Sequence, residues 1–476
     1  MCNLRLRIFS VILEIKMTRS VDMLNGGLLK KIIVFTIPIM LQGLLQSIYN
    51  AADLIVVGQF SGGTALAAVG ATSSIYNVII GLFMGVSAGV DVISSFYYGM
   101  RDERSVKKTI DTAVILAPIL GLVVMVVGIF IAGPVLEVMN TPAGGVLEGA
   151  TLYLQIVMIG VPFSMLYNFC AAIYRTAGET KRPFIYLVIS GLLNVLLNLL
   201  FCAVLDMGVV GVAIATVVSQ VASSMMIFID LLHNKGLFSF SFKNIEFCFH
   251  KLKRMVAIGI PAGLQSAAFS LSNVFLQSGV NSFGPDAIEG STAVSTIEGL
   301  MWVTLTSFIN ANTTFTSQNV AAGKVDRARK TLRYTILMTT ILGVVLGLSM
   351  FFGKKWIMAI FIKDNPIAVG YGFQRLKYTF PLYFMAGIMG ILPGAIRGHG
   401  SSLSPSMITI FGTCGIRIIW VFTVFEFYHD LSILYLVHPI TWVFTITALS
   451  INYVIVLRRT IKKQKNNELQ LAESLG

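Results

Sequence analysis

The sequence has little charge for its length. Only 12% of its 476 residues are charged and 55% are hydrophobic, whereas soluble domains carry roughly 25% charged residues. The mean hydropathy is +0.81. So few charges cannot cover a water-facing surface of this size. The composition excludes an ordinary soluble domain and predicts that lipid covers much of the protein.

Residues that carry out chemistry are also scarce. The five histidines are scattered and form no HExxH pattern, and no GxSxG motif comes with a catalytic triad. The cysteines show no CxxC spacing and no nearby histidine pattern, so we predict neither a disulfide framework nor a zinc site. They are Cys2, Cys170, Cys202, Cys248 and Cys414. The protein is therefore not expected to be an enzyme, and we expect no cofactor.

Hydrophobic runs long enough to span a membrane, roughly 20 residues each, recur twelve times. They lie near 32–57, 65–98, 110–132, 150–173, 184–204, 209–231, 255–281, 288–320, 333–352, 376–396, 405–427 and 433–457. We therefore predict an all-α polytopic membrane protein. Met17 opens a second candidate start, MTRSVDMLNGGLLKK, so residues 1–16 are a candidate for a misassigned start.

Basic residues alternate along the gaps between these runs. Arg and Lys follow the second, fourth, sixth, eighth and twelfth runs, whereas the gaps at 58–64, 133–149, 205–208 and 282–287 have none. Positive loops stay in the cytoplasm, so both termini are predicted there, in a multi-pass plasma-membrane protein. This pattern explains the net charge of +13 better than nucleic-acid binding does. The gap at 353–377 does not follow this alternation. Within it, Trp356 to Ile362 could form an interfacial helix.

The two halves of the chain repeat each other. A shift of 223 residues places the first run on the seventh, and a shift of 222 relates the segments after the fourth and tenth runs. The matching pairs are Lys30 with Lys253, Pro38 with Pro261, Gln42 with Gln265, Ser47 with Ser270, Asn50 with Asn273, Arg104 with Arg327, Lys107 with Lys330, Arg175 with Arg397, Gly178 with Gly400, and Pro183 with Pro405. An even number of helices per half predicts two six-helix lobes related by a pseudo-two-fold axis along the membrane normal.

This repeat divides the chain into parts. We expect a cytoplasmic segment at 1–31, an N-lobe at 32–232, a cytoplasmic connector at 233–254, a C-lobe at 255–458 and a cytoplasmic tail at 459–476. By analogy, rocking of two such lobes suggests alternating access.

Ionisable residues inside a membrane are costly and indicate function by default. They are Asp53, Asp91, Glu289, Glu298 and Arg417. Asp53 ends a polar stripe of Gln42, Gln46 and Asn50 at helical spacing, and is the best candidate. The alternative is a carboxylate buried to stabilise packing. Glu289 could simply cap a helix, and no partner is evident for Asp91 or Arg417.

Two further runs carry polar groups suited to a cation. Asn194 and Asn198 share a helix face, and Thr216 lies in the next run. Carboxylate, amide and hydroxyl oxygens can hold a hard cation such as Na⁺, whereas a lone carboxylate can carry a proton. The asparagines could instead bond helix to helix. Candidates for a substrate cavity are Gln42, Gln46, Asn273, Glu298 and Arg417.

Several segments together resemble the multidrug and toxic compound extrusion family, with its DinF-like bacterial branch as the nearest match. They are IPIMLQGLLQSIYNAADLIVVGQF, ALAAVG, YRTAGETKRP, GVAIAT and IGIPAGLQ, and the resemblance covers about 17–458. It implies two lobes in a V, and antiport of a small, cationic amphipathic substrate against Na⁺ or H⁺. It also implies a monomer that binds no nucleic acid.

The resemblance also assigns roles to residues. The family's helix-one acid falls on Asp53, its helix-five pair on Asn194 and Asn198, and its helix-six threonine on Thr216; a C-lobe acid of some members matches Glu298 less securely. Many members have Asp at the position of Asn198, so this chain lacks one negative charge there. The choice between Na⁺ and H⁺ therefore stays open.

Other transport classes remain as alternatives. A flippase of a lipid-linked oligosaccharide, from the same superfamily, would use a wide basic cavity, yet Arg417 is the only clear mid-helix cation in the sequence. A major-facilitator carrier also has twelve helices, but the loop GMRDERSVKK lacks the second glycine of that class's motif. A channel suits two lobes around one buried acid less well than a carrier does.

Overall fold

Helices make up most of the described part of the chain, and that part contains no strand. The computed structural model describes residues 20–475 except 140, 143, 235, 363 and 364, so the question of the start at residues 1–16 lies outside it. Twelve helices are long and apolar enough to cross a membrane, and they coincide with the twelve predicted runs. The all-α polytopic prediction is confirmed.

The first six spans are built from the N-terminal half of the chain. They are α2 (Leu28–Phe60), α3 (Gly62–Gly99), α4 (Glu103–Val138), α5 (Val146–Thr176), α6 (Lys181–Asn198) with the π-helical η1 (Leu199–Val204), and α7 (Gly208–His233). We call this group the N-lobe.

The remaining six spans form the C-lobe. They are α8 (Phe249–Asn281), α9 (Pro285–Ala321), α10 (Val325–Phe352), α12 (Pro366–Thr379) with η2 (Phe380–Leu382) and α13 (Tyr383–Gly398), the interrupted run of α14 (Leu403–Thr409), η3 (Ile410–Gly415), α15 (Ile416–Trp420), η4 (Val421–Phe425) and α16 (Glu426–Tyr428), and finally α17 (Leu431–Leu475). A short helix, α11 (Lys354–Phe361), precedes α12.

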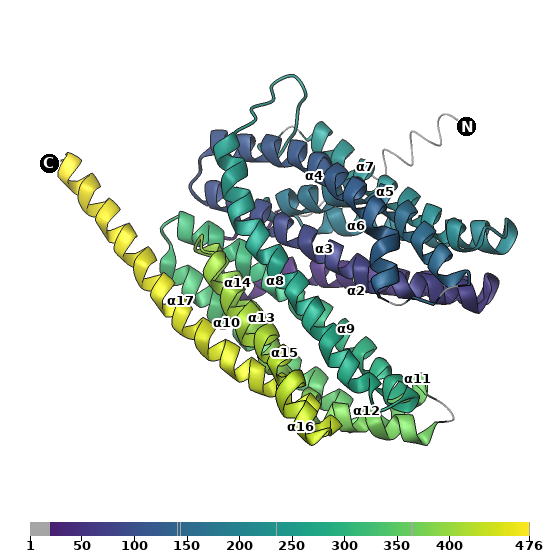
Figure 1. The fold of residues 1–476 in the computed structure, drawn as a ribbon. Coiled ribbons are helices and arrows are strands. Elements are labelled where there is room, and N and C mark those ends of the chain that lie inside the picture. The colour runs from purple at the N-terminus through teal and green to yellow at the C-terminus, as the bar shows by residue number, and fades with distance from the viewer. Residues whose placement is uncertain (1–19, 140, 143, 235, 363–364, 476) are drawn as a thin grey trace.

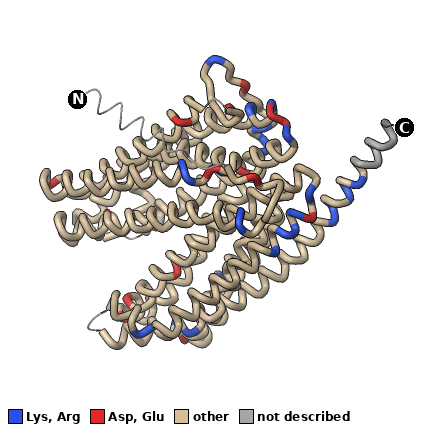
Figure 2. Tube along the Cα trace, turned by 180° about the vertical axis from the view of Figure 1, so that it is seen from behind, with Lys and Arg blue, Asp and Glu red and all other residues tan. Residues whose placement is uncertain are grey.

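The two lobes meet at one end of the molecule and diverge toward the other (Figure 1). Helix α3 packs along α8, and both α2 and α3 contact α9. Lys and Arg gather at the end where the lobes meet, around the connector after α7 and the C-terminal part of α17 (Figure 2). This end of the bundle is therefore the basic end that the alternating loops predicted.

The sequence repeat is also a spatial repeat. Thr314 donates hydrogen bonds to both carboxylate oxygens of Asp91, at 3.2 and 2.9 Å, and the two residues are 223 positions apart. Close by, Ser317 donates to the carbonyl of Val92 at 2.8 Å. A residue that contacts its own repeat mate must lie beside the axis that relates the halves. The pseudo-two-fold axis therefore passes between α3 and α9.

A stripe of small residues lets the lobes approach closely. Gly81, Gly85 and Gly89 recur every four residues on α3 and face α8. A Cβ atom on Gly85 would lie 2.1 Å from the backbone nitrogen of Gly263, and one on Gly89 would lie 2.2 Å from the carbonyl oxygen of Met255. Small residues spaced by four are the usual means by which membrane helices pack backbone to backbone. The close contact between α3 and α8 is therefore set by glycine, whereas large apolar side chains such as Phe35 and Phe315 fill the contact between α2 and α9.

Replacing Gly85 by alanine is expected to loosen this interface. The new methyl group must push the α8 backbone away, so the thermal unfolding temperature of the purified protein should fall, by an amount equivalent to about 1–3 kcal/mol. Gly70→Ala is the matched control, because Gly70 lies on the same helix and a Cβ atom added there would have no neighbouring atom within 4 Å. Equal unfolding temperatures for the two variants would contradict the assigned role of the stripe.

The tenth span begins earlier than the hydrophobic run suggested. The run placed it at 376–396, but α12 already begins at Pro366. The sequence placed Arg375 and Lys377 in the basic loop that does not follow the alternation. Both residues instead lie inside a spanning helix. Hydropathy missed the start of this helix because Arg375 is charged. In the structure Arg375 is buried and paired with Glu298.

Two other ends differ in detail. The residues expected to form an interfacial helix do form α11, with Met358 buried and Trp356 82% exposed. Helix α17 continues through the predicted cytoplasmic tail as far as Leu475, so this segment is helical. Charged residues are compatible with a continuing helix, so the loss of hydropathy does not mark the helix end.

Candidate functional site

The first candidate site surrounds Asp53, near the middle of the N-lobe. Asp53 lies on α2 and is only 8% exposed. The Asn198 side-chain amide donates a short hydrogen bond to its Oδ1 atom and a second one, of 3.3 Å, to Oδ1 of Asn194. No Lys or Arg forms an ion pair with Asp53 among the described residues. The groups that contact the carboxylate are therefore neutral.

Polar side chains of α6 and α7 surround this carboxylate. Oδ1 of Asn198 is buried and has no hydrogen-bond partner among the described residues. Thr216 of α7 also lies near the Asp53 carboxyl, although its hydroxyl donates to the carbonyl of Val212 at 2.9 Å. Carboxylate, amide and hydroxyl oxygens are the donor set that hard cations prefer. The arrangement can hold either a cation or a proton.

The polar stripe of α2 does not act as one unit. Gln42 donates to the hydroxyl of Tyr167 at 3.1 Å, inside the N-lobe. Gln46 donates to Asn50 at 3.3 Å, and both of these side chains are exposed. Asn50 therefore forms no hydrogen bond with the Asp53 group, although the sequence grouped them. The helix turns far enough between Asn50 and Asp53 to present one to an open face and the other to α6.

The second candidate site is a cavity of about 320 Å³ inside the C-lobe. It is lined from α8, α9, α12, α13, α15 and α17, and it contains three of the predicted cavity residues, Asn273, Glu298 and Arg417. Gln42 and Gln46 are not part of it. The residues predicted to line one cavity therefore divide between two separate places.

An ion pair forms part of the cavity wall. Arg375 donates to Glu298 at 2.6 Å through Nη2 and at 3.4 Å through Nε. It also donates from Nη1 to the side chain of Ser291, and the Tyr383 hydroxyl donates to the backbone carbonyl of Glu298 at 2.9 Å. Both charges are largely removed from solvent. Removing either partner of such a pair destabilises the protein, because the other is then a buried charge without a counter-charge.

Arg417 is fully buried at the other side of the same cavity. Its Nη1 donates to Oδ1 of Asn273 at 3.0 Å, and its Nη2 approaches Nδ1 of His438 at 3.3 Å. The guanidinium carbon lies 4.9 Å from the centre of the Phe269 ring. These contacts hold the guanidinium firmly, and none of them involves an acid.

The other intramembrane acids have structural partners. Asp91 pairs with Arg175 at 3.5 Å and accepts from Thr314 across the lobes, so it joins the lobes. Glu289 lies one turn into α9 and accepts from Asn365 at 2.8 Å, in keeping with a residue near a helix start. Neither belongs to the two candidate sites.

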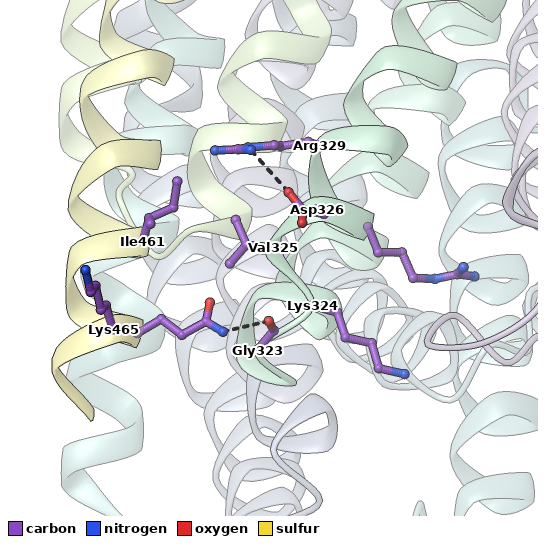
Figure 3. Close-up of a pocket in the computed structure, with 9 residues that line it drawn as sticks. Gly323, Lys324, Val325, Asp326, Arg329, Ile461 and Lys465 are labelled. Atoms are coloured by element: carbon purple, nitrogen blue, oxygen red, sulfur yellow. Dashed lines mark hydrogen bonds and ion pairs between the residues drawn. The ribbon is translucent and has the colours of Figure 1, made fainter. Parts of the chain in front are cut away.

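A wider hollow of about 660 Å³ lies on the surface at the basic end. It is formed where the start of α10 meets the end of α17 (Figure 3). Arg329 pairs with Asp326 at 3.1 Å in its wall, and the Gln464 side chain donates to the carbonyl of Gly323 at 3.0 Å. Exposed pairs of this kind contribute little. The Nε atom of Arg329 is buried without a hydrogen-bond partner among the described residues, but the side chain as a whole is 37% exposed.

Reasoning from the sequence missed Arg375 and His438, which line the C-lobe cavity together with Arg417. Arg375 was assigned to a loop, and His438 was not singled out. A signal for Arg375 was present, because Asn365-Pro366 is a typical helix start: the Asn365 side chain accepts from the backbone of Ala368 at 3.1 Å, and Pro366 occupies the first turn. His438 gives no such signal, since one histidine in an apolar run is usually a packing residue.

Comparison with known proteins gives consistent matches. A protein-family model described as MatE matches residues 38–200 and again residues 261–423, which is the same spacing as the internal repeat. The chain is 26% identical to "Probable multidrug resistance protein YoeA" of Bacillus subtilis over 392 residues, 81% of this chain and 84% of that protein. It is 23% identical to "Probable multidrug resistance protein NorM" of Thermotoga maritima, over 80% of this chain and 82% of that protein.

Among solved structures, the fold resembles one titled "Outward-facing conformation of a multidrug resistance MATE family transporter of the MOP superfamily". The TM-score is 0.84 at 22% identity, covering 95% of this chain and 100% of that one. At this identity the likeness is one of fold.

Proposed function

Because this chain belongs to the MatE family, we propose that it exports small organic molecules by antiport, driven by Na⁺ or H⁺ that returns through the Asp53 site. The two lobes would alternate in exposing their facing surfaces to either side of the membrane. The observation that carries the proposal is the buried Asp53 carboxylate, which is contacted by the Asn198 amide and by no basic partner among the described residues. A cation is the natural counter-charge of such a group.

Two features support export in particular. Relatives matched over most of their length are named as multidrug resistance proteins. The concentration of Lys and Arg at the end where the lobes meet (Figure 2) supports a cytoplasmic position for that end and for both termini. With this orientation, the lobes diverge toward the outside of a plasma membrane.

The groups around Asp53 determine which coupling ions the site can accept. The site contains one carboxylate, because position 198 is an asparagine. A proton needs only that one carboxylate, whereas Na⁺ needs several oxygens, and Asn198, Asn194 and Thr216 can supply them. Both ions are therefore compatible with the site, and the proposal covers both. The multidrug names of the relatives give no support to a lipid-linked oligosaccharide flippase.

Transport by the purified protein in proteoliposomes tests the proposal. Ethidium serves as the probe, because a cationic amphipath is the substrate expected from the family resemblance. We expect ethidium movement to depend on an imposed Na⁺ or pH gradient and to stop when an ionophore collapses that gradient. Ethidium movement that is insensitive to both gradients would rule out antiport, and empty liposomes control for leakage.

A further inference from the structure

The C-lobe cavity contains a buried basic group that no acid neutralises directly. Arg417 is 1% exposed, and its Nε has no hydrogen-bond partner among the described residues. Its neighbours are the Asn273 amide and His438. A guanidinium can only donate, so Nδ1 of His438 must accept, and the imidazole is neutral. A buried cation with only neutral partners is unfavourable unless an anion joins it.

Among the described residues that line the cavity, the one acid is Glu298, and it already has a partner. Both carboxylate oxygens of Glu298 accept from Arg375. The cavity wall therefore contains two guanidinium groups and one carboxylate, and the surplus is one positive charge. That charge is located on Arg417, across the cavity from the pair.

Equivalent positions of the repeat have residues of different polarity in the two lobes. A shift of 223 residues places Asn50 on Asn273 and the acid Asp53 on Leu276. Leu276 lines the C-lobe cavity. The C-lobe thus has an apolar residue where the N-lobe has its carboxylate, and it has gained Arg417. The positive charge of Arg417 makes this cavity less favourable for a cation than the Asp53 site.

The surroundings of Arg417 resemble a ligand site in two further respects. The π-helical segments η3 and η4 flank α15 on both sides, and such wide turns are frequent at functional sites. Aromatic rings form the walls: Phe269 stacks on Trp302 with centroids 5.8 Å apart, and Trp442 lies beside His438. The volume of about 320 Å³ lies at the small end of typical ligand sites.

We propose that the C-lobe cavity binds the oxyanion group, a carboxylate or sulfonate, of a small aromatic molecule, with Arg417 as the counter-charge. The aromatic walls would hold the ring system, and the guanidinium would receive the acidic group through Nε, the nitrogen without another partner among the described residues. Binding itself does not require transport, but its role as a substrate site rests on the proposed function. In that role it implies that exported molecules include aromatic acids or zwitterions.

Equilibrium dialysis of the full chain in detergent tests this, with 2-naphthoate and its uncharged analogue 2-naphthamide as probes. The wild type is expected to bind the carboxylate about tenfold more tightly than the amide. Arg417→Gln should abolish this preference, and Arg417→Lys should retain part of it. Asp53→Asn should leave it unchanged. Equal binding of the two probes by the wild type would overturn the proposal, and so would a preference that survives Arg417→Gln.

A second pair of variants keeps the test decisive if Arg417→Gln does not fold. Leu276→Asp supplies a carboxylate inside the cavity, where it should compete for Arg417 and lower naphthoate affinity about tenfold. Leu276→Asn has the same size without the charge and should have a much smaller effect. Equal effects of the two would overturn the proposal. So would displacement of naphthoate by phosphatidylglycerol, because the occupant would then be a lipid headgroup.

These measurements use no ion gradient. Failure of ethidium transport would therefore refute the antiport proposal and leave this one standing. Loss of the naphthoate preference with intact ethidium transport would refute the oxyanion proposal and leave the antiport proposal standing.

Discussion

Asp53→Asn is expected to reduce gradient-driven transport to below about a tenth of the wild-type rate, because it removes the only charge of the N-lobe site. The substitution keeps the size of the side chain, so the Asn198 and Asn194 contacts have no steric reason to change. The residual movement of substrate should no longer respond to either a Na⁺ or a pH gradient. Substrate flux in proteoliposomes, measured with each gradient imposed separately, checks this.

Two companion variants interpret the result. Asn50→Ala on the same helix is the matched control, since Asn50 is exposed and forms no bond with Asp53; its transport should stay near wild type. Asn198→Asp supplies the second carboxylate that many members of the family have, and should increase the response to Na⁺ relative to H⁺. Wild-type coupling in Asp53→Asn would mean that the ion returns elsewhere, and would shift attention to Glu298.

Glu298→Gln is expected to destabilise the protein by about 3–5 kcal/mol, because it leaves Arg375 buried in the C-lobe without its counter-charge. Exposure of Arg375 is 9%, so water cannot replace the lost carboxylate. Unfolding in a titration of denaturing detergent, followed by tryptophan fluorescence, measures the change. The double variant Glu298→Gln/Arg375→Gln should recover much of the loss, since both charges are then absent.

Lys377→Gln serves as the control for this pair. Lys377 lies two residues from Arg375 on α12 but is exposed, so its replacement should change stability by less than about 0.5 kcal/mol. If the double variant is no more stable than Glu298→Gln, the ion pair does not account for the effect. A loss equal to that of Lys377→Gln would mean that Arg375 has water within reach.

Hydropathy, the alternation of basic loops and the internal repeat determined most of the architecture from the sequence alone. All twelve spans were found where the runs lie, because a membrane helix must be apolar along about 20 residues whatever it packs against. The repeat was visible because Pro38 and Pro261, or Arg104 and Arg327, keep identity and register across the halves. Asp53, Asn194 and Asn198 were singled out as polar residues that are costly to bury, the family resemblance grouped them, and the structure places them in contact.

Only the tertiary structure decided which polar groups meet. Asn50 and Asp53 belong to one polar stripe in the sequence. In the structure they lie a fraction of a helical turn apart, so that Asn50 is on an open face and Asp53 contacts α6. Arg375 was hidden because hydropathy counts a cation as an interruption, whereas Glu298, far away in the sequence, neutralises it. Arg417 was recognised as unusual, but its amide and imidazole partners come from α8 and α17. Such contacts depend on how separate helices are rotated and packed, and the residue pattern of any single helix does not contain that information.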